Sequence, residues 1–224
     1  MTALCLYSYL FSIAADKKQN YILKGWDHSL ENTDIGALST HGSAKTIDGG
    51  IEMIAGGKDI WGTSDEFHFV YMKQSGNFDV AARIESLTAP HLYSRAGIMA
   101  REDLSADSRH VFFLAFPDNR PRHNNTSAYE FQYRERKGAE SHAIYPPQNP
   151  GPPKFPVDFP NVWVRVKRVQ NQFTGFVSND GKTWKEYGSY SIALPATVYL
   201  GLAATSHIAD AAINGRFKDL REMH

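Results

Sequence analysis

The stretch Glu66-Phe-His-Phe-Val-Tyr-Met72 decides the fold class of this 224-residue chain. Its aromatic residues Phe67, Phe69 and Tyr71 alternate with polar Glu and His. The stretch Asn77-Phe-Asp-Val-Ala-Ala-Arg-Ile-Glu85 follows with the same period of two. Successive side chains of a β-strand point to opposite faces, so this period predicts two half-buried strands.

Further short strands are expected along the rest of the chain, separated by clusters of Gly, Asn and Asp. The clearest hairpin turns at Asn179-Asp-Gly181, whose residues tolerate positive φ. Only Leu104–Arg109 predicts as much as one helical turn. Many short strands with Gly-rich turns predict an all-β, antiparallel β-sandwich. The remaining predicted strands are Ala96–Arg101, His110–Phe116, Tyr129–Arg134, Val162–Val169, Gln172–Ser178, Lys182–Tyr187, Val198–Thr205 and Ile213–Phe217.

Composition excludes several classes of protein. The 24 basic and 24 acidic residues balance, whereas a nucleic-acid binder needs a basic excess to displace counterions from phosphates. The single cysteine, Cys5, rules out an internal disulfide framework and a Cys-rich zinc site.

The apolar start Met1–Ala15, followed by Asp16, is typical of a secretory signal and is too short for a comfortable membrane span. We therefore expect residues 16–224 to form one jelly-roll domain that is secreted, periplasmic or on the cell surface. The alternative is that Met1–Ala15 is a first strand or tail of the folded domain. The mature chain is expected to contain no membrane span.

The segment from about 117 to 160 is rich in proline and predicts a long, extended loop. Long loops in compact domains are commonly functional. The alternative is an inert surface insertion.

Seven motifs, in the same order along roughly residues 25 to 220, resemble a known family. They are Asp34–Gly36, Gly57–Tyr71, Ala96–Glu102, Ser108–His110, Trp163–Arg165, Phe173–Trp184 and Val198–His207. The family is that of the concanavalin A-like jelly-roll modules of secreted bacterial proteins labelled "regulation of enolase protein 1". The resemblance implies two curved antiparallel sheets packed face to face, a fold that also serves lectins, sugar-binding appendages and glucanases.

A catalytic carboxylate pair is not evident from the sequence. Glucanases of this fold typically carry Glu-x-Asp-x-x-Glu on one strand, and that run is missing here. The neighbours Asp65 and Glu66 would face opposite ways, and Glu130 and Glu135 differ in parity. A cross-strand pair such as Asp79 with Glu130 keeps a carbohydrate-active hydrolase open as an alternative.

Metal binding has little support in the sequence. The nine histidines show no His-x-His or His-Glu-x-x-His spacing, so no zinc site is expected. Structural calcium stays open, because its oxygen ligands can come from scattered aspartates. The candidates are Asp27, Asp34, Asp59 and Asp65, which otherwise are solvated turn residues.

Polar side chains on the strand faces supply the candidate ligand-binding residues. If their strands are neighbours, they form a polar strip on an exposed, concave sheet, where arginine and amide donors suit sugar hydroxyls. Aromatic side chains beside such a strip can stack on sugar rings. The alternative is that the arginines pair with acidic residues across strands. The candidates are Arg83, Arg101, Gln132 and Arg134 for the strip, and Tyr129 and Trp61 for stacking.

Together these patterns favour a lectin-like module that binds a glycan or polysaccharide without catalysis. A hydrolase and a structural or protein-interaction module are the alternatives. Trp163 and Trp184 are expected to serve the core rather than the ligand.

Overall fold

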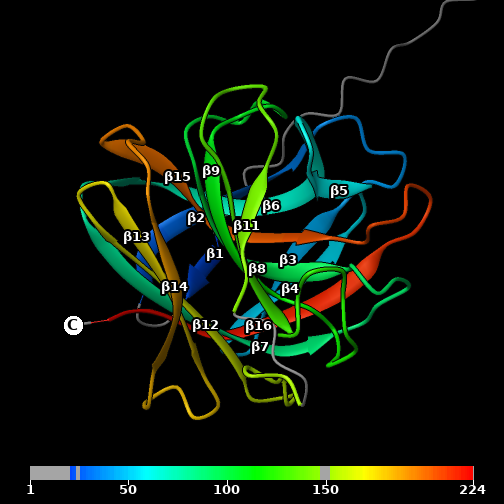
Figure 1. Ribbon diagram of the computed structural model, residues 1–224. Coiled ribbons are helices and arrows are strands. Elements are labelled where there is room, and N and C mark those ends of the chain that lie inside the picture. The colour runs from blue at the N-terminus through cyan, green and yellow to red at the C-terminus, as the bar shows by residue number, and fades with distance from the viewer. Residues whose placement is uncertain (1–20, 24–25, 147–151, 224) are drawn as a thin grey trace, which may run out of the picture.

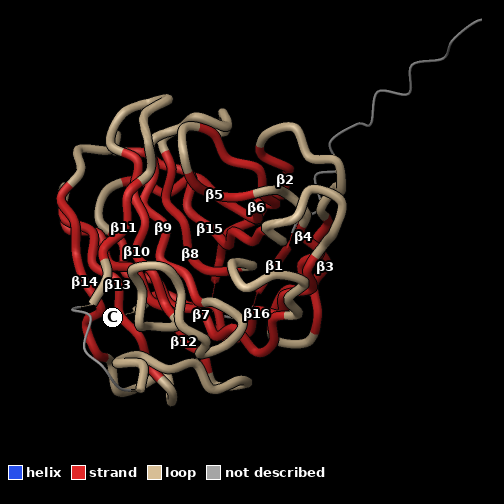
Figure 2. The backbone as a smooth tube through the Cα atoms, turned by 45° about the vertical axis from the view of Figure 1, so that its right-hand side comes forward, coloured by secondary structure: helices blue, strands red, loops and turns tan. Residues whose placement is uncertain are grey.

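The computed structural model describes residues 21–23, 26–146 and 152–223. In these residues every regular element is a β-strand, and the strands form two antiparallel sheets packed into a sandwich (Figure 1). The tube view likewise contains strands and loops without a helix in the part described (Figure 2). No helix of that part is long and apolar enough to cross a membrane.

One sheet has nine strands. Eight of them lie in the order β1-β2-β6-β15-β8-β9-β10-β11, and β5 pairs with β6. Neighbouring strands come from distant parts of the sequence, as a jelly roll requires. The strands are β1 (Tyr21–Leu23), β2 (Trp26–Ile35), β5 (Asp59–Trp61), β6 (Ser64–Ser75), β8 (Arg95–Arg101), β9 (His110–Ala115), β10 (Tyr129–Arg134), β11 (His142–Ile144) and β15 (Thr197–Thr205).

The other sheet has seven strands in the order β14-β13-β12-β7-β16-β4-β3. Its strands are β3 (Ser43–Ile47), β4 (Gly50–Ala55), β7 (Phe78–Leu87), β12 (Val162–Val169), β13 (Gln172–Ser178), β14 (Lys185–Ser191) and β16 (Ile213–Glu222). The hairpin of β13 and β14 ends in the turn that contains Gly181, whose φ is +67°.

The predicted antiparallel sandwich of concanavalin A-like, jelly-roll type is confirmed. Each strand expected from residue 66 onward overlaps an observed one. The strand expected from Lys182 begins only at Lys185, because the Asp180 carboxylate accepts the N–H groups of Lys182 (2.8 Å) and Thr183 (2.7 Å) and holds them in the turn.

The helical turn expected at Leu104–Arg109 was wrong. Bends and turns occupy this segment instead. The Ser108 hydroxyl accepts the N–H of Asp103 at 3.0 Å, and Arg101 donates to the carbonyl of Asp103 at 2.7 Å. One backbone hydrogen bond, from the Ser108 N–H to the Ser105 carbonyl (3.1 Å), closes a turn there, and the carbonyls of Asp103 and Ser105 accept from Arg101.

Alternation along the strands creates two apolar layers. Val70 and Met72 of β6 face the seven-stranded sheet and join the main core. Phe67, Phe69 and Tyr71 face the opposite side, which we call the outer face, and form a second cluster with residues of β8 and β9. The loop that follows β8 covers this cluster through Leu104 and Ala106. Both faces of the central strands are therefore buried.

Trp163 is buried as expected, but not in the core between the sheets. It packs at right angles to Trp184, with ring centroids 6.2 Å apart, beneath the hairpin turn of β13 and β14. A Cβ atom added to Gly181 would lie 2.6 Å from the Trp163 ring, so both the positive φ and the close contact require glycine there.

Two expectations fall on residues outside those described. The signal expected at Met1–Ala15 lies there entirely, and so do residues 147–151 of the proline-rich segment.

Candidate functional site

A pocket of about 230 Å³ opens at one end of the outer face of the nine-stranded sheet. It lies where β8 and β10 begin and where β15 ends. Both the strand ends and the loops beyond them supply its walls. The lining residues are Asp59, Trp61, Tyr93, Arg95, His123, Glu130, Tyr145 and His207.

Arg95 lies at the centre of the polar wall. Its side chain is 4% exposed, and its guanidinium stacks over Phe116 with 5.6 Å between the charged carbon and the ring centroid. Nε donates to the carbonyl of Tyr93 (3.0 Å), and Nη2 forms an ion pair with Asp59 Oδ1 at 2.8 Å. Nη1 lies 3.8 Å from Glu130 Oε1, beyond hydrogen-bond distance. One guanidinium thus separates two carboxyl groups that come from different strands.

The two carboxyl groups have pKa values shifted in opposite directions. Burial raises the pKa of Asp59, but Arg95 and His207 outweigh it and hold that pKa below its ordinary value. Burial raises the pKa of Glu130, and the more distant Arg95 with the amides of Gln132 and Asn125 offsets it only in part. Asp59 is therefore the stronger acid of the pair.

Aromatic side chains form the other wall. Trp61 at the rim is one of only two large apolar side chains exposed in the described residues, at 36%. His207 stacks on His91 with centroids 4.5 Å apart and lies 5.4 Å from Tyr93. Burial and the neighbouring Glu130 raise the pKa of Tyr145 to about 12, so its hydroxyl keeps its proton. Flat apolar surface and hydrogen-bonding groups therefore meet in one small cavity.

The predicted polar strip is only partly assembled. Arg101, Gln132 and Arg134 do share the outer face, on β8 and β10 at either side of β9, but none of them has exposed surface. Arg134 donates two parallel hydrogen bonds to Asp65, Nη2 to Oδ1 at 2.7 Å and Nη1 to Oδ2 at 2.9 Å. Arg101 Nη2 lies 3.6 Å from Asp65 Oδ2.

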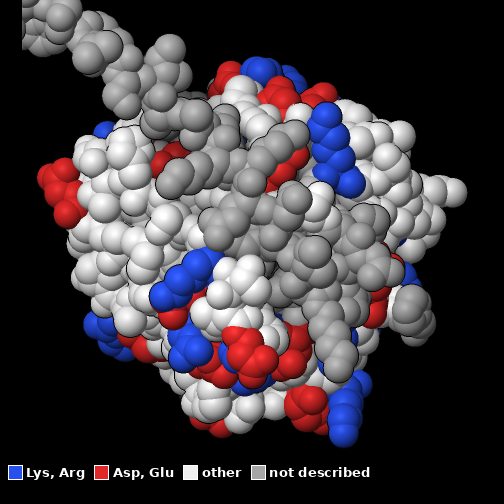
Figure 3. All heavy atoms as spheres, turned by 180° about the vertical axis from the view of Figure 1, so that it is seen from behind, with Lys and Arg blue, Asp and Glu red and all other residues white. Residues whose placement is uncertain are grey.

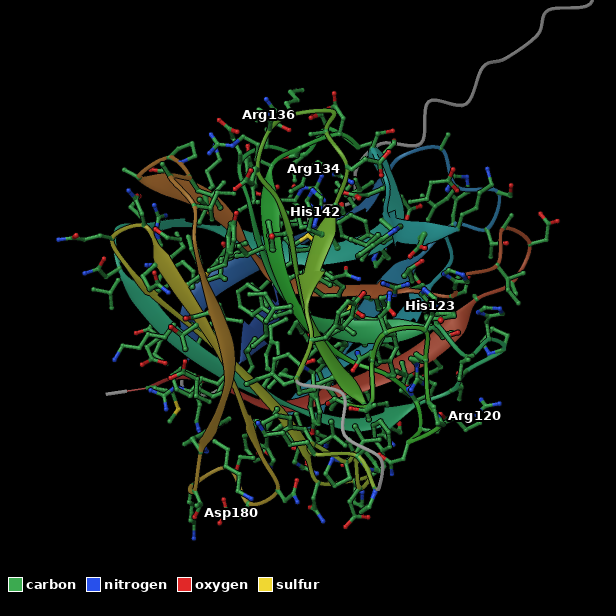
Figure 4. All side chains as sticks on the ribbon, in the orientation of Figure 1. Arg120, His123, Arg134, Arg136, His142 and Asp180 are labelled. Carbon is green, nitrogen blue, oxygen red and sulfur yellow. The ribbon has the colours of Figure 1, made fainter. Side chains whose placement is uncertain are left out.

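We call Asp65, Arg101, His110 and Arg134 the sealed cluster. Backbone carbonyls accept the remaining donors of its arginines, including Gly62 O at 3.0 Å from Arg134 Nη2. Burial and the two arginines hold the pKa of His110 well below its usual range. Arg134 lies toward the upper end of the sheet in Figure 4, whereas His123 of the pocket lies on a separate loop. The charged groups of the sealed cluster therefore already have partners, and no member of the cluster has exposed surface for a ligand to reach.

Two other candidates lie elsewhere. Arg83 is on β7 of the seven-stranded sheet, where its Nε donates to Asp219 at 2.7 Å, so the expectation that it joins the strip was wrong. Tyr129 is 1% exposed and faces the core between the sheets, where its ring stacks on Phe113. Their positions follow from strand order and parity. Of the six candidates, Trp61 is the one that lines the pocket.

The structure does not form the pair of Asp79 with Glu130 that the sequence left open as an alternative. Asp79 lies on β7, where Arg165 binds both of its oxygens at 2.6 Å. The carboxyl group that shares the pocket with Glu130 is instead that of Asp59.

The aspartates considered for calcium do not converge. Asp34 accepts hydrogen bonds from His68 (2.7 Å) and His41 (2.9 Å), while Asp59 and Asp65 pair with different arginines. Across the part of the chain described, no three His, Cys, Asp or Glu side chains are grouped as a metal would need. The side chain of Asp27 lies outside the described part.

Sequence reasoning missed most of this pocket. Arg95 has the same parity as Arg101 and precedes the predicted strand by one residue, so a strand drawn one residue longer would have placed it on the outer face. Asp59 was noted for calcium alone. Tyr93, His123, Tyr145 and His207 carry no sequence signal, because their loops meet only in the folded chain.

No protein-family model matches this chain, and no curated protein is similar to it in sequence. Solved structures with the same fold do exist. A functionally unknown protein from Saccharomyces cerevisiae is 16% identical with a TM-score of 0.61, covering 86% of this chain and 95% of that one. A mutant of the GH43 protein BlXynB from Bacillus licheniformis is 12% identical with a TM-score of 0.55.

The match to the GH43 protein covers 81% of this chain but 34% of that one, so this chain spans about a third of its length. At these identities the likeness shows the fold alone. It supports the jelly-roll assignment, and the narrower label "regulation of enolase protein 1" stays a prediction.

The charges visible in Figure 3 are interspersed, with Lys and Arg beside Asp and Glu over the part of that face that grey atoms do not cover. Together with the equal numbers of basic and acidic residues, this distribution gives a polyanion no extended basic surface on that part.

Proposed function

We propose that this chain binds a glycan in the pocket around Arg95, outside the cytoplasm. The observation that carries the proposal is the exposed indole of Trp61 beside a wall of donors and acceptors formed by Asp59, Arg95 and Glu130. A sugar ring offers an apolar C–H face to an aromatic side chain and hydroxyl groups to polar ones. The location follows from the export signal expected at Met1–Ala15.

Binding without turnover is the first choice, because Asp59 is already engaged at both oxygens. Oδ1 accepts the N–H of Ile60 (2.7 Å) and lies 2.8 Å from Arg95 Nη2 in an ion pair, and Oδ2 lies 3.2 Å from His207 Nδ1. A nucleophile or base would have to give up at least one of these partners.

Hydrolysis is the second candidate, favoured by the opposite pKa shifts of the two carboxyl groups. In that case the protonated Glu130 would give its proton to the glycosidic oxygen, and Asp59 would activate the attacking water or attack the sugar carbon. Water adds across the cleaved bond, so each event produces one new reducing end.

A glycan array with the purified chain tests the proposal, followed by calorimetric titration of any glycan that binds. Arg95→Gln should abolish binding, while the matched change Arg83→Gln on the other sheet should leave affinity unchanged. Thermal unfolding of both variants checks that each is folded. Binding without new reducing ends after long incubation supports a binding module.

New reducing ends that disappear in Glu130→Gln would instead establish the hydrolase. No binding and no cleavage across a broad panel would refute both and favour the interaction module.

A further inference from the structure

The pocket alternates acceptors and donors along one wall. Asp59 lies on one side of the Arg95 guanidinium as its ion-pair partner, and Glu130, whose Oε1 also accepts from Gln132 Nε2, presents a second carboxyl group on the other side. The separation of 3.8 Å between Arg95 Nη1 and Glu130 Oε1 leaves these two groups without a hydrogen bond to each other. Because Arg95 and Glu130 both line the pocket, a ligand group placed there can lie beside both Nη1 and a carboxyl oxygen.

A hydroxyl group matches this arrangement because it accepts and donates at once. One sugar hydroxyl can accept from Arg95 and donate to Glu130, and its neighbour on the ring can bond to the Asp59 side of the same guanidinium. A lone hydroxyl can bond only at the Glu130 side or at the Asp59 side of the guanidinium. Two adjacent hydroxyls can bond at both sides.

An anionic sugar does not match the wall. A carboxylate or sulfate can only accept hydrogen bonds. Arg95 already has two acidic neighbours, Asp59 at 2.8 Å and Glu130 at 3.8 Å. His207 Nδ1 lies 3.2 Å from Asp59 Oδ2. An acidic group placed here would meet two carboxyl groups for one guanidinium, which repels it when both are ionised.

Cavity size limits the ligand to a small part of a glycan. About 230 Å³ is below the roughly 300–1,000 Å³ of pockets that enclose drug-sized ligands. Trp61 at the rim can then contact the next part of the chain.

We propose that the pocket recognises a neutral sugar residue through two adjacent free hydroxyl groups, and that the Asp59–Arg95–Glu130 wall selects it against uronate and sulfated sugars. This inference rests on the proposed glycan binding and names the class of glycan. It concerns selectivity, so its failure differs from a failure to bind any glycan.

The test uses three matched probes in calorimetric titration: a neutral oligosaccharide that binds, the same oligosaccharide after periodate cleavage of its vicinal diols and borohydride reduction, and oligogalacturonate. Loss of the diols should weaken binding about tenfold or more, since a charge-assisted hydrogen bond goes with each hydroxyl. Oligogalacturonate should bind no better than the cleaved probe. Equal binding of the treated and untreated probes would overturn the inference, as would tighter binding of oligogalacturonate.

Glu130→Gln sharpens the test, because it removes one carboxyl group and keeps the shape. We expect it to raise the affinity for oligogalacturonate relative to the neutral probe by a few fold. Glu135→Gln, an exposed change just beyond β10, is the matched control and should leave the ratio unchanged. A ratio that Glu130→Gln does not move would refute the role of this wall in selectivity. If no neutral oligosaccharide of a broad panel and no oligogalacturonate binds, that result counts against the proposed function itself.

Discussion

Two groups of arginine and carboxylate lie on the outer face of one sheet, and they differ in what covers them. In the sealed cluster, Asp65 has no exposed surface and Arg134 donates hydrogen bonds to both of its carboxylate oxygens. In the pocket, Asp59 is 26% exposed and shares Arg95 with Glu130. The same chemistry thus gives a buried structural ion pair at one end of β8 and β10 and an accessible site at the other end.

The loops that lie over the two groups account for their difference in exposure. The loop after β8 lies over the outer face and supplies carbonyl groups to the buried arginines, such as Asp103 O to Arg101. At the opposite end of β8 and β10, loop residues line the pocket and Trp61 stays exposed at its rim. A buried ion pair must have its charges fully satisfied, whereas a binding site must keep donors unsatisfied.

Asp65→Asn gives the largest expected effect. It leaves two buried guanidinium groups facing a neutral amide, so the free energy of unfolding should fall by about 3–5 kcal/mol. Urea denaturation followed by tryptophan fluorescence measures it. Arg83→Gln is the control, because the Arg83–Asp219 pair is partly exposed and is worth at most about 1 kcal/mol.

If the free energy of unfolding of Asp65→Asn falls by less than about 1 kcal/mol, the sealed cluster does not stabilise the sheet. The contrast drawn between the sealed cluster and the pocket would then be wrong.

Gly181→Val tests stability far from both groups. The variant places a β-branched residue at positive φ and in contact with the Trp163 ring. The free energy of unfolding should therefore fall by about 2–4 kcal/mol. Because the hairpin belongs to the other sheet, glycan affinity per folded molecule should stay unchanged. Thermal unfolding and titration of the folded fraction measure the two effects. Weaker affinity at full folding would mean that the pocket depends on the whole sandwich.

The sheets were predictable because their signal is local. The alternation in Glu66–Met72 gave β6, and the turn at Asn179–Gly181 gave the hairpin. Strands before residue 64 were not predicted, because polar residues weaken the alternating pattern. In β3, for example, Ser43, Lys45 and Thr46 are exposed.

The site was less predictable because exposure is not local. Parity placed Arg101 and Arg134 on the correct face, but the loop that buries them is visible only in the folded chain. Parity also could not say that Arg83 belongs to the other sheet, because that depends on strand order. Trp61 was found from its residue type, and the loop residues of the pocket had no pattern to find.

Trp61→Ala is expected to act on the pocket without acting on the fold. Removing a stacking partner should weaken glycan affinity by about 1 kcal/mol, or roughly fivefold. Since Trp61 is 36% exposed, the unfolding midpoint should barely move. Val169→Ala, at the other large exposed apolar side chain of the described residues, is the matched control and should change neither quantity. Unchanged affinity in Trp61→Ala would remove the rim from the proposed site.

The smallest effect is the pH dependence of stability, and here the two carboxyl groups of the pocket should differ in sign. The pKa of folded Asp59 lies below 3.8, so its ionised form contributes stability that is present above that value and lost as pH falls through the folded pKa. The pKa of folded Glu130 lies above 4.5, so its contribution is present below that value and lost as pH rises through the folded pKa. Urea unfolding at steps from pH 3 to pH 7 should therefore show Asp59→Asn falling further behind the wild type as pH rises, while Glu130→Gln gains on it. If the free energies of unfolding of both variants run parallel to that of the wild type across this pH range, the two carboxyl groups do not differ in the sign of their pKa shifts. Arg95 would then not favour the ionised form of Asp59 over that of Glu130.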